Sequence, residues 1–290
     1  MSAARVFIGM PVYNGARYIE RAIASLQAQT LGDFTLLVAD NASTDDTAAI
    51  VRKAAARDSR VRYVRHAHNI GAPRNWNFVL QRASGDYFKW ATANDECSAE
   101  LLARCVAALD GDRTAVLCQG RTCLVDEASG ARHEYALDLA LMQERPADRL
   151  RQLSLALQLN NGQCGVMRLS MLRQTRGERL YPGGDIALMA ELALLGRFIV
   201  LPQVLFERRM GPNTFSRALR SDQMAAFYGA HAEHSPLFER LRLHVDVLRA
   251  ALTLPLPAAE RAAAVGVAMR RIAWDRNHLW SDLRTRLRTP

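Results

Sequence analysis

The stretch LLVADNASTDDTAAIV at residues 36–51 decides the fold class. Its apolar run at 36–39 is typical of a short buried strand, which we expect to end at Asp40. Ser43 stands three residues before Asp46, a hydroxyl-to-carboxylate spacing with which many helices begin, and we expect that helix to continue through Val51. The stretch therefore predicts a strand, a polar turn and a helix, in that order.

The same alternation extends through the first 110 residues. We expect strands at 5–8, 61–64 and 87–90, the first of them stopping at Pro11, and helices over 19–26 and 75–80. Strands that alternate with helices pair in parallel, and the helices pack on both faces of the sheet. The sequence thus predicts an α/β fold with a mostly parallel sheet flanked by helices.

After about residue 110 this alternation loosens. We expect one or two strands within 114–124, a helix at 150–159, a glycine-rich turn at 181–185 that opens a helix at 186–195, and a strand at 198–201 closed by Pro202. From Ala218 we expect only helices, broken near Pro236 and at 255–257. An apolar stripe in the last segment favours packing on the main body over contact with a membrane surface; it comprises Val265, Met269, Ile272, Leu279, Leu283 and Leu287.

The composition is that of an ordinary globular protein. Of the 290 residues, 49% are hydrophobic and 23% are charged, which excludes a disordered or collagen-like chain. No stretch approaches the roughly 20 apolar residues of a membrane span. The N-terminus also lacks the apolar core of a signal peptide. We expect a cytoplasmic protein, with peripheral contact at the inner face of the membrane left open.

The net charge of +9 is concentrated near the C-terminus, where residues 240–290 hold ten arginines against four acidic residues. Such a segment suits a membrane surface or a phosphate-bearing substrate at least as well as it suits nucleic acid. A solvated helix face explains it slightly better, and we expect no nucleic-acid partner. The five cysteines are an odd number without the spacing of a zinc site, and we expect reduced, mostly buried thiols.

Polar clusters follow four of the predicted strands, at 11–14, 40–41, 68–71 and 94–96. Each cluster alone would be an ordinary turn. Because ligands of parallel sheets bind beyond the carboxyl ends of the strands, we expect the four clusters to form one shared site. The chain has no G-x-G-x-x-G motif after its first strand, no phosphate-binding P-loop motif and no G-x-S-x-G motif. Dinucleotide-dependent oxidoreductases, P-loop kinases and α/β-hydrolases therefore lose support.

These clusters resemble the motifs of the family 2 glycosyltransferases, whose fold is the Rossmann-like GT-A fold. The resemblance covers about residues 5–215 and is carried by residues 9–14, 18–19, 38–45, 69–71, 75, 90–95, 165–168, 184–185, 194–198 and 208–209. It implies a GT-A domain at 1–215, with a nucleotide-sugar part at 1–110 and an acceptor part at 111–215. Residues 216–290 would form a helical extension.

The resemblance assigns the nucleotide to the first three polar clusters. Asp40 would accept the N3–H of a uracil or thymine ring, Tyr13 would stack on that ring, and Pro11 would hold the turn. The alternatives are a partly buried core position for Tyr13 and a helix-capping role for Asp40. Further residues expected to bind the nucleotide-sugar are Asn69, Gly71, Arg74 and Asn94.

A divalent metal, Mn²⁺ or Mg²⁺, is implied at Asp95, which matches the last aspartate of the family's acidic motif. Asn94 stands where an aspartate is usual, which weakens the site or shifts a ligand to Glu96. Many members also have a histidine after the arginine pair, whereas here Met210 follows Arg209. A histidine ligand is therefore not expected.

Asp185 matches the family's general base, the carboxylate that takes the proton of the acceptor hydroxyl. The alternative is that it only caps the following helix. Glu191 is a weaker candidate for the same role. With a base and no residue that suggests a covalent intermediate, the implied outcome is single displacement with inversion at the anomeric carbon.

The resulting hypothesis is an inverting glycosyltransferase that moves a sugar from a UDP- or dTDP-sugar to a hydroxyl of a saccharide or lipid-linked acceptor. The resemblance to the family implies a role in bacterial surface polysaccharide or glycoconjugate biosynthesis. The helical extension would contribute packing, homodimer formation or membrane-surface contact. The alternatives are a non-catalytic nucleotide-sugar binding protein of the same fold and, less well supported, a basic nucleic-acid binding protein.

Overall fold

All seven residues of β1 (Val6–Val12) are buried, and the strand has a neighbour on each side. A computed structural model describes residues 4–211, 227 and 239–287 of the chain. β1 pairs in parallel with β2 (Phe34–Asp40) on one side and β4 (Tyr87–Trp90) on the other, and β2 pairs in parallel with β3 (Val61–Arg65). The parallel sheet predicted from the first 110 residues is therefore confirmed.

The rest of the sheet is mixed. Its order is β3-β2-β1-β4-β8-β6-β9-β5, and β7 pairs with β6 outside this path. The added strands are β5 (Glu96–Cys97), β6 (Ala115–Asp126), β7 (Arg132–Tyr135), β8 (Val166–Arg168) and β9 (Arg197–Met210). β8 is antiparallel to both β4 and β6, whereas β9 is parallel to β6. Of the one or two strands expected within 114–124, the structure contains one, β6.

Two prolines expected to end strands lie inside them. Residues two apart in a strand point their backbone groups toward the same neighbour. The Gly9 carbonyl points toward β4, so the backbone nitrogen of Pro11 points toward the same side, beyond the last pair of residues that joins β1 to β4. No ladder bond is lost there by the missing N–H. In β9, Pro202 lies where the register with β6 jumps from Leu201 to Val204, so it occupies an irregularity in the ladder.

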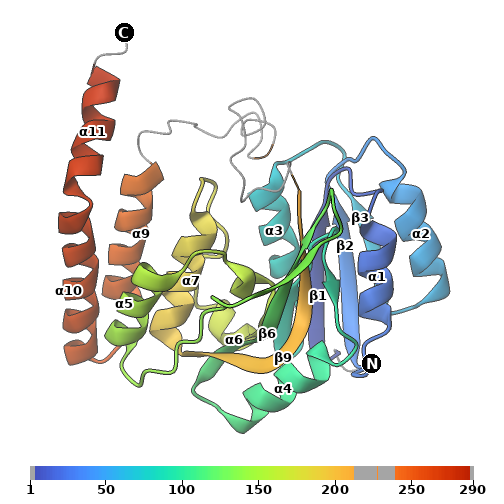
Figure 1. Cartoon of the computed structure of the whole chain (residues 1–290), viewed down its shortest axis with the longest axis horizontal. Helices are drawn as coiled ribbons and strands as arrows, with labels where there is room; N and C mark the ends of the chain where they lie inside the picture. The colour runs from blue at the N-terminus through green and yellow to red at the C-terminus, as the bar shows by residue number, and fades with distance from the viewer. Residues whose placement is uncertain (1–3, 212–226, 228–238, 288–290) are drawn as a thin grey trace.

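The helices lie on both faces of the sheet (Figure 1). They are α1 (Ile19–Gln27), α2 (Thr47–Arg57), α3 (Ala72–Gln81), α4 (Leu101–Gly111), α5 (Pro146–Ala156), the 3-10 helix η1 (Asn161–Cys164), α6 (Leu169–Leu172), α7 (Gly184–Leu195), α9 (Glu239–Thr253), α10 (Ala258–Trp274) and α11 (Arg276–Leu287). The helix expected at 150–159 starts and ends earlier, as α5. No described helix is long and apolar enough to cross a membrane.

Alternate residues of the strands divide the core in two. Val6, Ile8 and Met10 belong to a cluster that includes α1 and α4, whereas Phe7 joins Phe88 in a cluster with α3, α5, α7, α9 and α10. This division follows from the period-two geometry of strands. All five cysteines are unpaired thiols, and three of them are buried, as expected.

The C-terminal helices pack against this second cluster. Ala250 and Ala251 of α9 and Ala264 of α10 are buried in it, and the break expected at 255–257 separates the two helices. α10 packs through other residues than the predicted apolar stripe. It buries Ala264, Val267 and Ala268, whereas Met269 of that stripe is exposed. The expected helix start at Ala218 and break near Pro236 lie outside the described residues, as do the side chains of Leu283 and Leu287.

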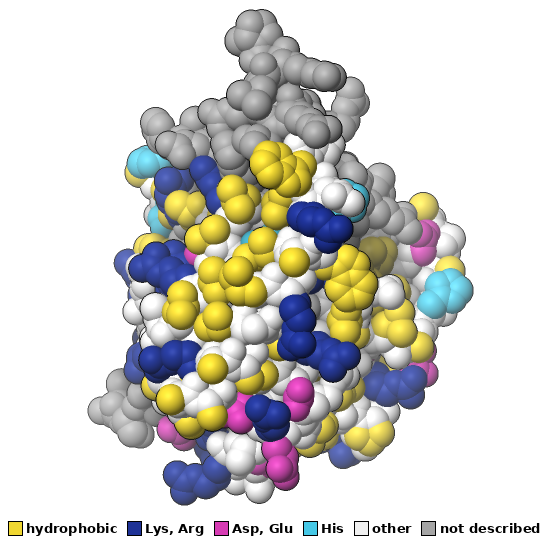
Figure 2. Space-filling model, turned by 90° about the vertical axis from the view of Figure 1, so that its left-hand side faces the viewer, with side chains coloured by type: hydrophobic (Ala, Val, Ile, Leu, Met, Phe, Trp, Pro, Cys, Tyr) yellow, Lys and Arg dark blue, Asp and Glu magenta, His cyan; other side chains and the backbone are white. Residues whose placement is uncertain are grey.

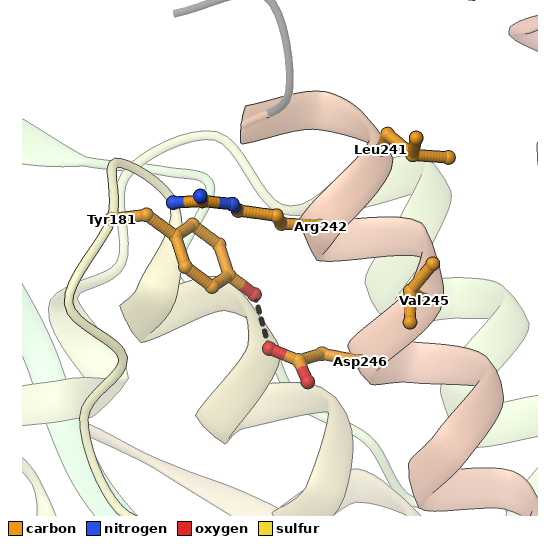
Figure 3. Close-up of a pocket in the computed structure, with 5 residues that line it drawn as sticks. All are labelled: Tyr181, Leu241, Arg242, Val245 and Asp246. Atoms are coloured by element: carbon orange, nitrogen blue, oxygen red, sulfur yellow. Dashed lines mark hydrogen bonds between the residues drawn. The ribbon is translucent and has the colours of Figure 1, made fainter. Parts of the chain in front are cut away.

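One carboxylate fastens α9 to the loop before α7. Asp246 accepts a hydrogen bond of 2.6 Å from the Tyr181 hydroxyl (Figure 3). It also pairs with Arg176 and Arg179. Burial by itself would raise the pKa of Asp246, but the bonds from Tyr181 and Arg176 and the charge of Arg179 lower it. Because that pKa lies below the ordinary value, this contact stabilises the fold above the ordinary carboxyl range.

Replacing Asp246 with alanine should lower the free energy of unfolding by about 3 kcal/mol at neutral pH, since it leaves Arg179 buried without this partner. Urea denaturation of the wild type and the variant measures the difference. The difference should shrink as the pH falls through the lowered pKa, where the wild type loses the same stabilisation. Asp33→Ala, on an exposed loop, is the control; an equal effect of both variants would contradict the role of Asp246.

Candidate functional site

A cavity of about 810 Å³ opens at the carboxyl ends of β1, β2 and β4. Residues from all four predicted polar clusters line it, among them Tyr13, Asn41, Asn69 and Asp95. The structure thus brings together stretches that are far apart in the chain, as the strand ends predicted. Asp185, from the second half of the chain, lines the same cavity.

The loop after β1 is held by the turn after β2. Ser43 Oγ accepts a 2.9 Å bond from the backbone N–H of Asn14, and Thr47 Oγ1 accepts one of 2.9 Å from that of Gly15. The Asp45 carboxylate accepts from the N–H of Ala16, also at 2.9 Å. The helix expected after this turn is confirmed, as α2. The N-cap residue Asp46 makes no side-chain cap bond, but the Asp45 carboxylate accepts from the Thr47 N–H at 3.1 Å, so one turn serves both the helix start and the neighbouring loop.

Pro11 and Tyr13 both line the cavity, and Tyr13 is 47% exposed, which excludes a core position for its ring. Asn41 and Asn69 form a bonded pair beside them: the Asn41 amide donates to Asn69 Oδ1 at 2.7 Å, and Asn41 Oδ1 accepts from the Ile70 N–H at 2.8 Å. A ring stacked on Tyr13 would therefore meet a fixed row of amide groups.

Asp40, Gly71 and Arg74 are not among the lining residues, in contrast to the sequence prediction. Asp40 is fully buried; its carboxylate accepts bonds from the Tyr63 hydroxyl at 2.6 Å and the Ser43 N–H at 2.8 Å. Burial, and next the bond to Asp40, raise the pKa of Tyr63 to about 12. Asp40 therefore holds the turn from beneath, and Asn41 takes its place at the cavity surface.

Gly71 has a φ of 85° at the start of α3, where its N–H donates to Asn69 Oδ1 at 2.8 Å. A positive φ is readily adopted by glycine, and here it turns the chain from the Asn69 loop into the helix. The Arg74 guanidinium lies near the Ile70 carbonyl, at 3.5 Å. Both residues thus support the loop from behind.

At the acidic motif, Asn94 and Asp95 line the cavity. Asp95 Oδ1 accepts from the Arg209 N–H at 2.8 Å, and Oδ2 accepts from the Thr92 hydroxyl. Burial raises the pKa of Asp95. The Glu96 carboxylate instead pairs with Arg21 and Arg209, so it is occupied by cations.

A divalent metal fits this place through Asp95. Mg²⁺ and Mn²⁺ are commonly held by one or two carboxylates together with substrate phosphates, and a buried carboxylate gains from a nearby cation. Within the part of the chain that the structure describes, no three His, Cys, Asp or Glu side chains gather as a metal cage. Asp95 would therefore need the donor phosphates to complete the ligand set.

Asp185 lies in the first turn of α7, after Gly183 with a φ of 85°. α7 has no side-chain cap bond, so Asp185 does not cap it. Its Oδ2 accepts a 2.9 Å bond from the Asn160 amide, and the residue lines the cavity. Glu191 is buried against Arg179 and is not among the lining residues.

The lining residues that were not predicted include Asn160, Gln163 and Glu178. The Gln163 amide donates to Glu178 Oε2 at 3.0 Å. Asn160 and Gln163 belong to the polar run NNGQ at 160–163, which follows the helix expected at 150–159. That run could have indicated a polar site in the sequence. Each of the two residues places its amide beside a carboxylate of the cavity.

Comparison with known proteins agrees with this architecture. The family model described as "Glycosyl transferase family 2" matches residues 7–175, more than half of the chain. A GalNAc(5)-diNAcBac-PP-undecaprenol beta-1,3-glucosyltransferase of Campylobacter jejuni is 32% identical over 88 residues, which are 30% of this chain and 28% of that protein. The putative glycosyltransferase EpsE of Bacillus subtilis is 30% identical over 113 residues, 39% of this chain and 41% of that protein. The matches thus span well under half of these relatives.

Solved structures share the fold over most of the chain. Staphylococcus aureus TarS 1-349 in complex with UDP superposes with a TM-score of 0.64 at 16% identity, covering 92% of this chain and 71% of that one. The mannosyltransferase PcManGT of Pyrobaculum calidifontis, in complex with GDP-Man and Mn²⁺, has a TM-score of 0.56 at 21% identity, covering 96% and 76%. The predicted GT-A fold is therefore confirmed.

Proposed function

Because this chain belongs to glycosyl transferase family 2, we propose that it transfers a sugar from a nucleotide-diphosphate sugar to a hydroxyl of a saccharide or glycolipid acceptor. The observation that carries the proposal is the single cavity in which Tyr13, Asp95 and Asp185 meet. It supplies an aromatic face for a base, a carboxylate for a metal and a carboxylate for proton transfer.

The donor is a UDP-sugar, with a dTDP-sugar as the second choice. Tyr13 would stack on the pyrimidine ring, and the amides of Asn41 and Asn69 would bond its polar edge. The UDP complex of TarS, a protein of the same fold, supports this choice of nucleotide. Residues 1–110 would then form the donor side and residues 111–215 the acceptor side, with 216–290 as an extension.

Asp95, with the oxygen of Asn94 beside it, would hold Mn²⁺ or Mg²⁺ against the donor diphosphate. When bound, such a metal supplies positive charge that stabilises the leaving diphosphate. Asp185 would take the proton of the attacking hydroxyl, and the Asn160 amide fixes the orientation of that carboxylate. A base that acts directly on the acceptor implies inversion at the anomeric carbon.

The substitution at Asn94 favours a second candidate, a nucleotide-sugar binding protein without turnover. It shares the donor half of the cavity with the enzyme. Only the enzyme uses Asp185, so the two candidates are separated at that residue.

The setting we propose is bacterial surface polysaccharide or glycoconjugate biosynthesis, with a lipid-linked acceptor. The name of the Campylobacter relative, which describes an undecaprenol-linked substrate, supports it. The outer side of α10 and α11 supports peripheral contact with a membrane. Met269, Trp274 and Trp280 are 51%, 71% and 58% exposed, and hydrophobic and basic side chains share this face (Figure 2).

The described acidic side chains of α10 and of the junction with α11 turn toward partners. Glu260 pairs with Arg145, and Asp275 pairs with Arg271. Arg270 and Arg276 are exposed. Among the described side chains, neither of these arginines has an acidic partner, and aromatic side chains beside such arginines suit an anionic lipid surface. A second copy of the chain is the competing occupant of this face.

Adding UDP-sugars, dTDP-sugars and GDP-mannose with Mn²⁺ should raise the melting temperature selectively, most for UDP-sugars. Asp95→Ala should remove most of the Mn²⁺-dependent part of that shift, since the metal loses its carboxylate. Thermal-shift measurements with and without Mn²⁺ provide the test. Equal shifts for the wild type and the variant would remove Asp95 from the metal site.

Asp185→Asn should reduce sugar transfer by at least about 10²-fold, because the amide cannot accept the proton. The affinity for UDP, measured by calorimetry, should stay within about twofold, since this residue lies outside the donor half. Parallel loss of binding and transfer would remove Asp185 from the base role. UDP binding without transfer or hydrolysis in the wild type would favour the non-catalytic candidate.

The protein should sediment with phosphatidylglycerol vesicles and much less with phosphatidylcholine vesicles, and the difference should fall with added salt. The double variant Arg270→Glu, Arg276→Glu should lose this binding, whereas Arg57→Glu on α2 should retain it. A stable dimer in solution with no vesicle binding would instead assign the face to a second copy.

A further inference from the structure

Asn77 of α3 holds the loop that carries Glu178, through the protein's own hydrogen bonds. The Asn77 amide donates to the Glu178 carbonyl at 2.7 Å, and Asn77 Oδ1 accepts from the Glu178 N–H at 2.8 Å. Gly177 allows this approach, because it has a φ of 68° and a Cβ there would lie 2.5 Å from Asn77 Oδ1. The backbone of Glu178 is therefore set before substrate arrives.

The side chain of Glu178 lines the cavity and has one oxygen engaged. Oε2 accepts the bond from Gln163 of η1, and no other described side chain bonds to this carboxyl group, so Oε1 is available to a ligand. The neighbouring cation, Arg179, pairs with Glu191 and Asp246. Among the described residues, no arginine, lysine or histidine forms an ion pair with Glu178. A carboxyl group built into a cavity wall without a cationic partner is unusual for a purely structural residue.

The groups that face Glu178 favour its neutral form. Burial raises the pKa of Glu178 well above the usual range, and the negative charge of Asp185 on α7 raises it further. Arg179 acts in the opposite direction with a smaller effect. The contacts from η1 and α3 are amides, which carry no charge. A neutral carboxyl in this position has an O–H to donate.

We propose that Glu178 determines acceptor specificity: its carboxyl group donates a hydrogen bond to an oxygen of the acceptor sugar while Asp185 takes the proton of the reacting hydroxyl. The proposal rests on the proposed function. The cavity is lined from both halves of the chain. Tyr13 and Asn69 come from the first half, and the second half supplies Asn160, Gln163, Glu178 and Asp185. The pair of carboxyl groups therefore belongs to the acceptor side, where two neighbouring sugar oxygens would meet one donor and one acceptor.

The experiment measures acceptor KM, kcat and UDP affinity for the wild type and for Glu178→Ala, Glu178→Gln and the control Glu20→Gln on the exposed side of α1. The acceptors are p-nitrophenyl glycosides of glucose, galactose, N-acetylglucosamine and rhamnose, and UDP release with water as acceptor is measured in parallel. Glu178→Ala should raise acceptor KM about tenfold, the effect of losing one hydrogen bond within a desolvated site. UDP affinity and UDP release to water should be unchanged.

Glu178→Gln should restore most of this loss, because an amide also accepts from Gln163 and donates into the cavity. In the wild type, acceptor KM should rise as the pH passes upward through the raised pKa, since the ionised group repels Asp185 and no longer donates. In Glu178→Gln that rise should be absent. A merely structural residue would change melting temperature and UDP affinity without altering this pH profile.

The proposal is overturned by an unchanged acceptor KM in Glu178→Ala, or by equal losses in the alanine and glutamine variants. A fall in UDP affinity that matches the change in acceptor KM overturns it as well. Absence of UDP binding, or of any transfer or hydrolysis by the wild type, counts against the proposed function instead, and the two failures are thereby distinguished.

Discussion

The shared direction of β1, β2, β3 and β4 is the constraint on which the rest of the molecule depends. Strands that run in parallel end at the same edge of the sheet, so the polar turns that follow them meet there. Both faces of β1 are buried under helices, which leaves this edge as the place where polar side chains meet solvent. The cavity is a consequence of that arrangement.

Side chains, more than backbone ladders, shape the walls of the cavity. The turn at 43–47 holds the loop that carries Tyr13, and Asn77 holds the loop that carries Glu178. In each case, polar side chains form hydrogen bonds with backbone groups of a neighbouring loop. The residues that remain able to bind a ligand, such as Tyr13 and Asp185, are thereby presented on a scaffold that is already fixed.

The helices at the C-terminus complete the second core and also reach the site. Asp246 of α9 binds Tyr181, Arg176 and Arg179, which flank Glu178 and precede Asp185. Within the described part of the chain, this contact engages Arg179, the cation adjacent to Glu178 in sequence. A helix distant in sequence thus engages the arginines beside Glu178, and links the packing of α9 to the electrostatics of this side of the cavity.

The positions of most strands and helices, the convergence of four polar clusters and the places of Tyr13, Asn69, Asp95 and Asp185 could all be predicted from the sequence, because they follow from local periodicity and from the family motifs. The predicted strand ends at Pro11 and Pro202 are wrong. Whether the missing N–H of a proline costs a hydrogen bond depends on which neighbouring strand it would face. Asp40 and Glu178 show the same limit: the carboxylate of Asp40 is bonded to Tyr63, and the pKa of Glu178 is raised by burial and by the charge of Asp185. Sequence determined which groups arrive at the edge of the sheet, whereas only the tertiary structure decided which of them are paired, because pairing is made by residues far away in the chain.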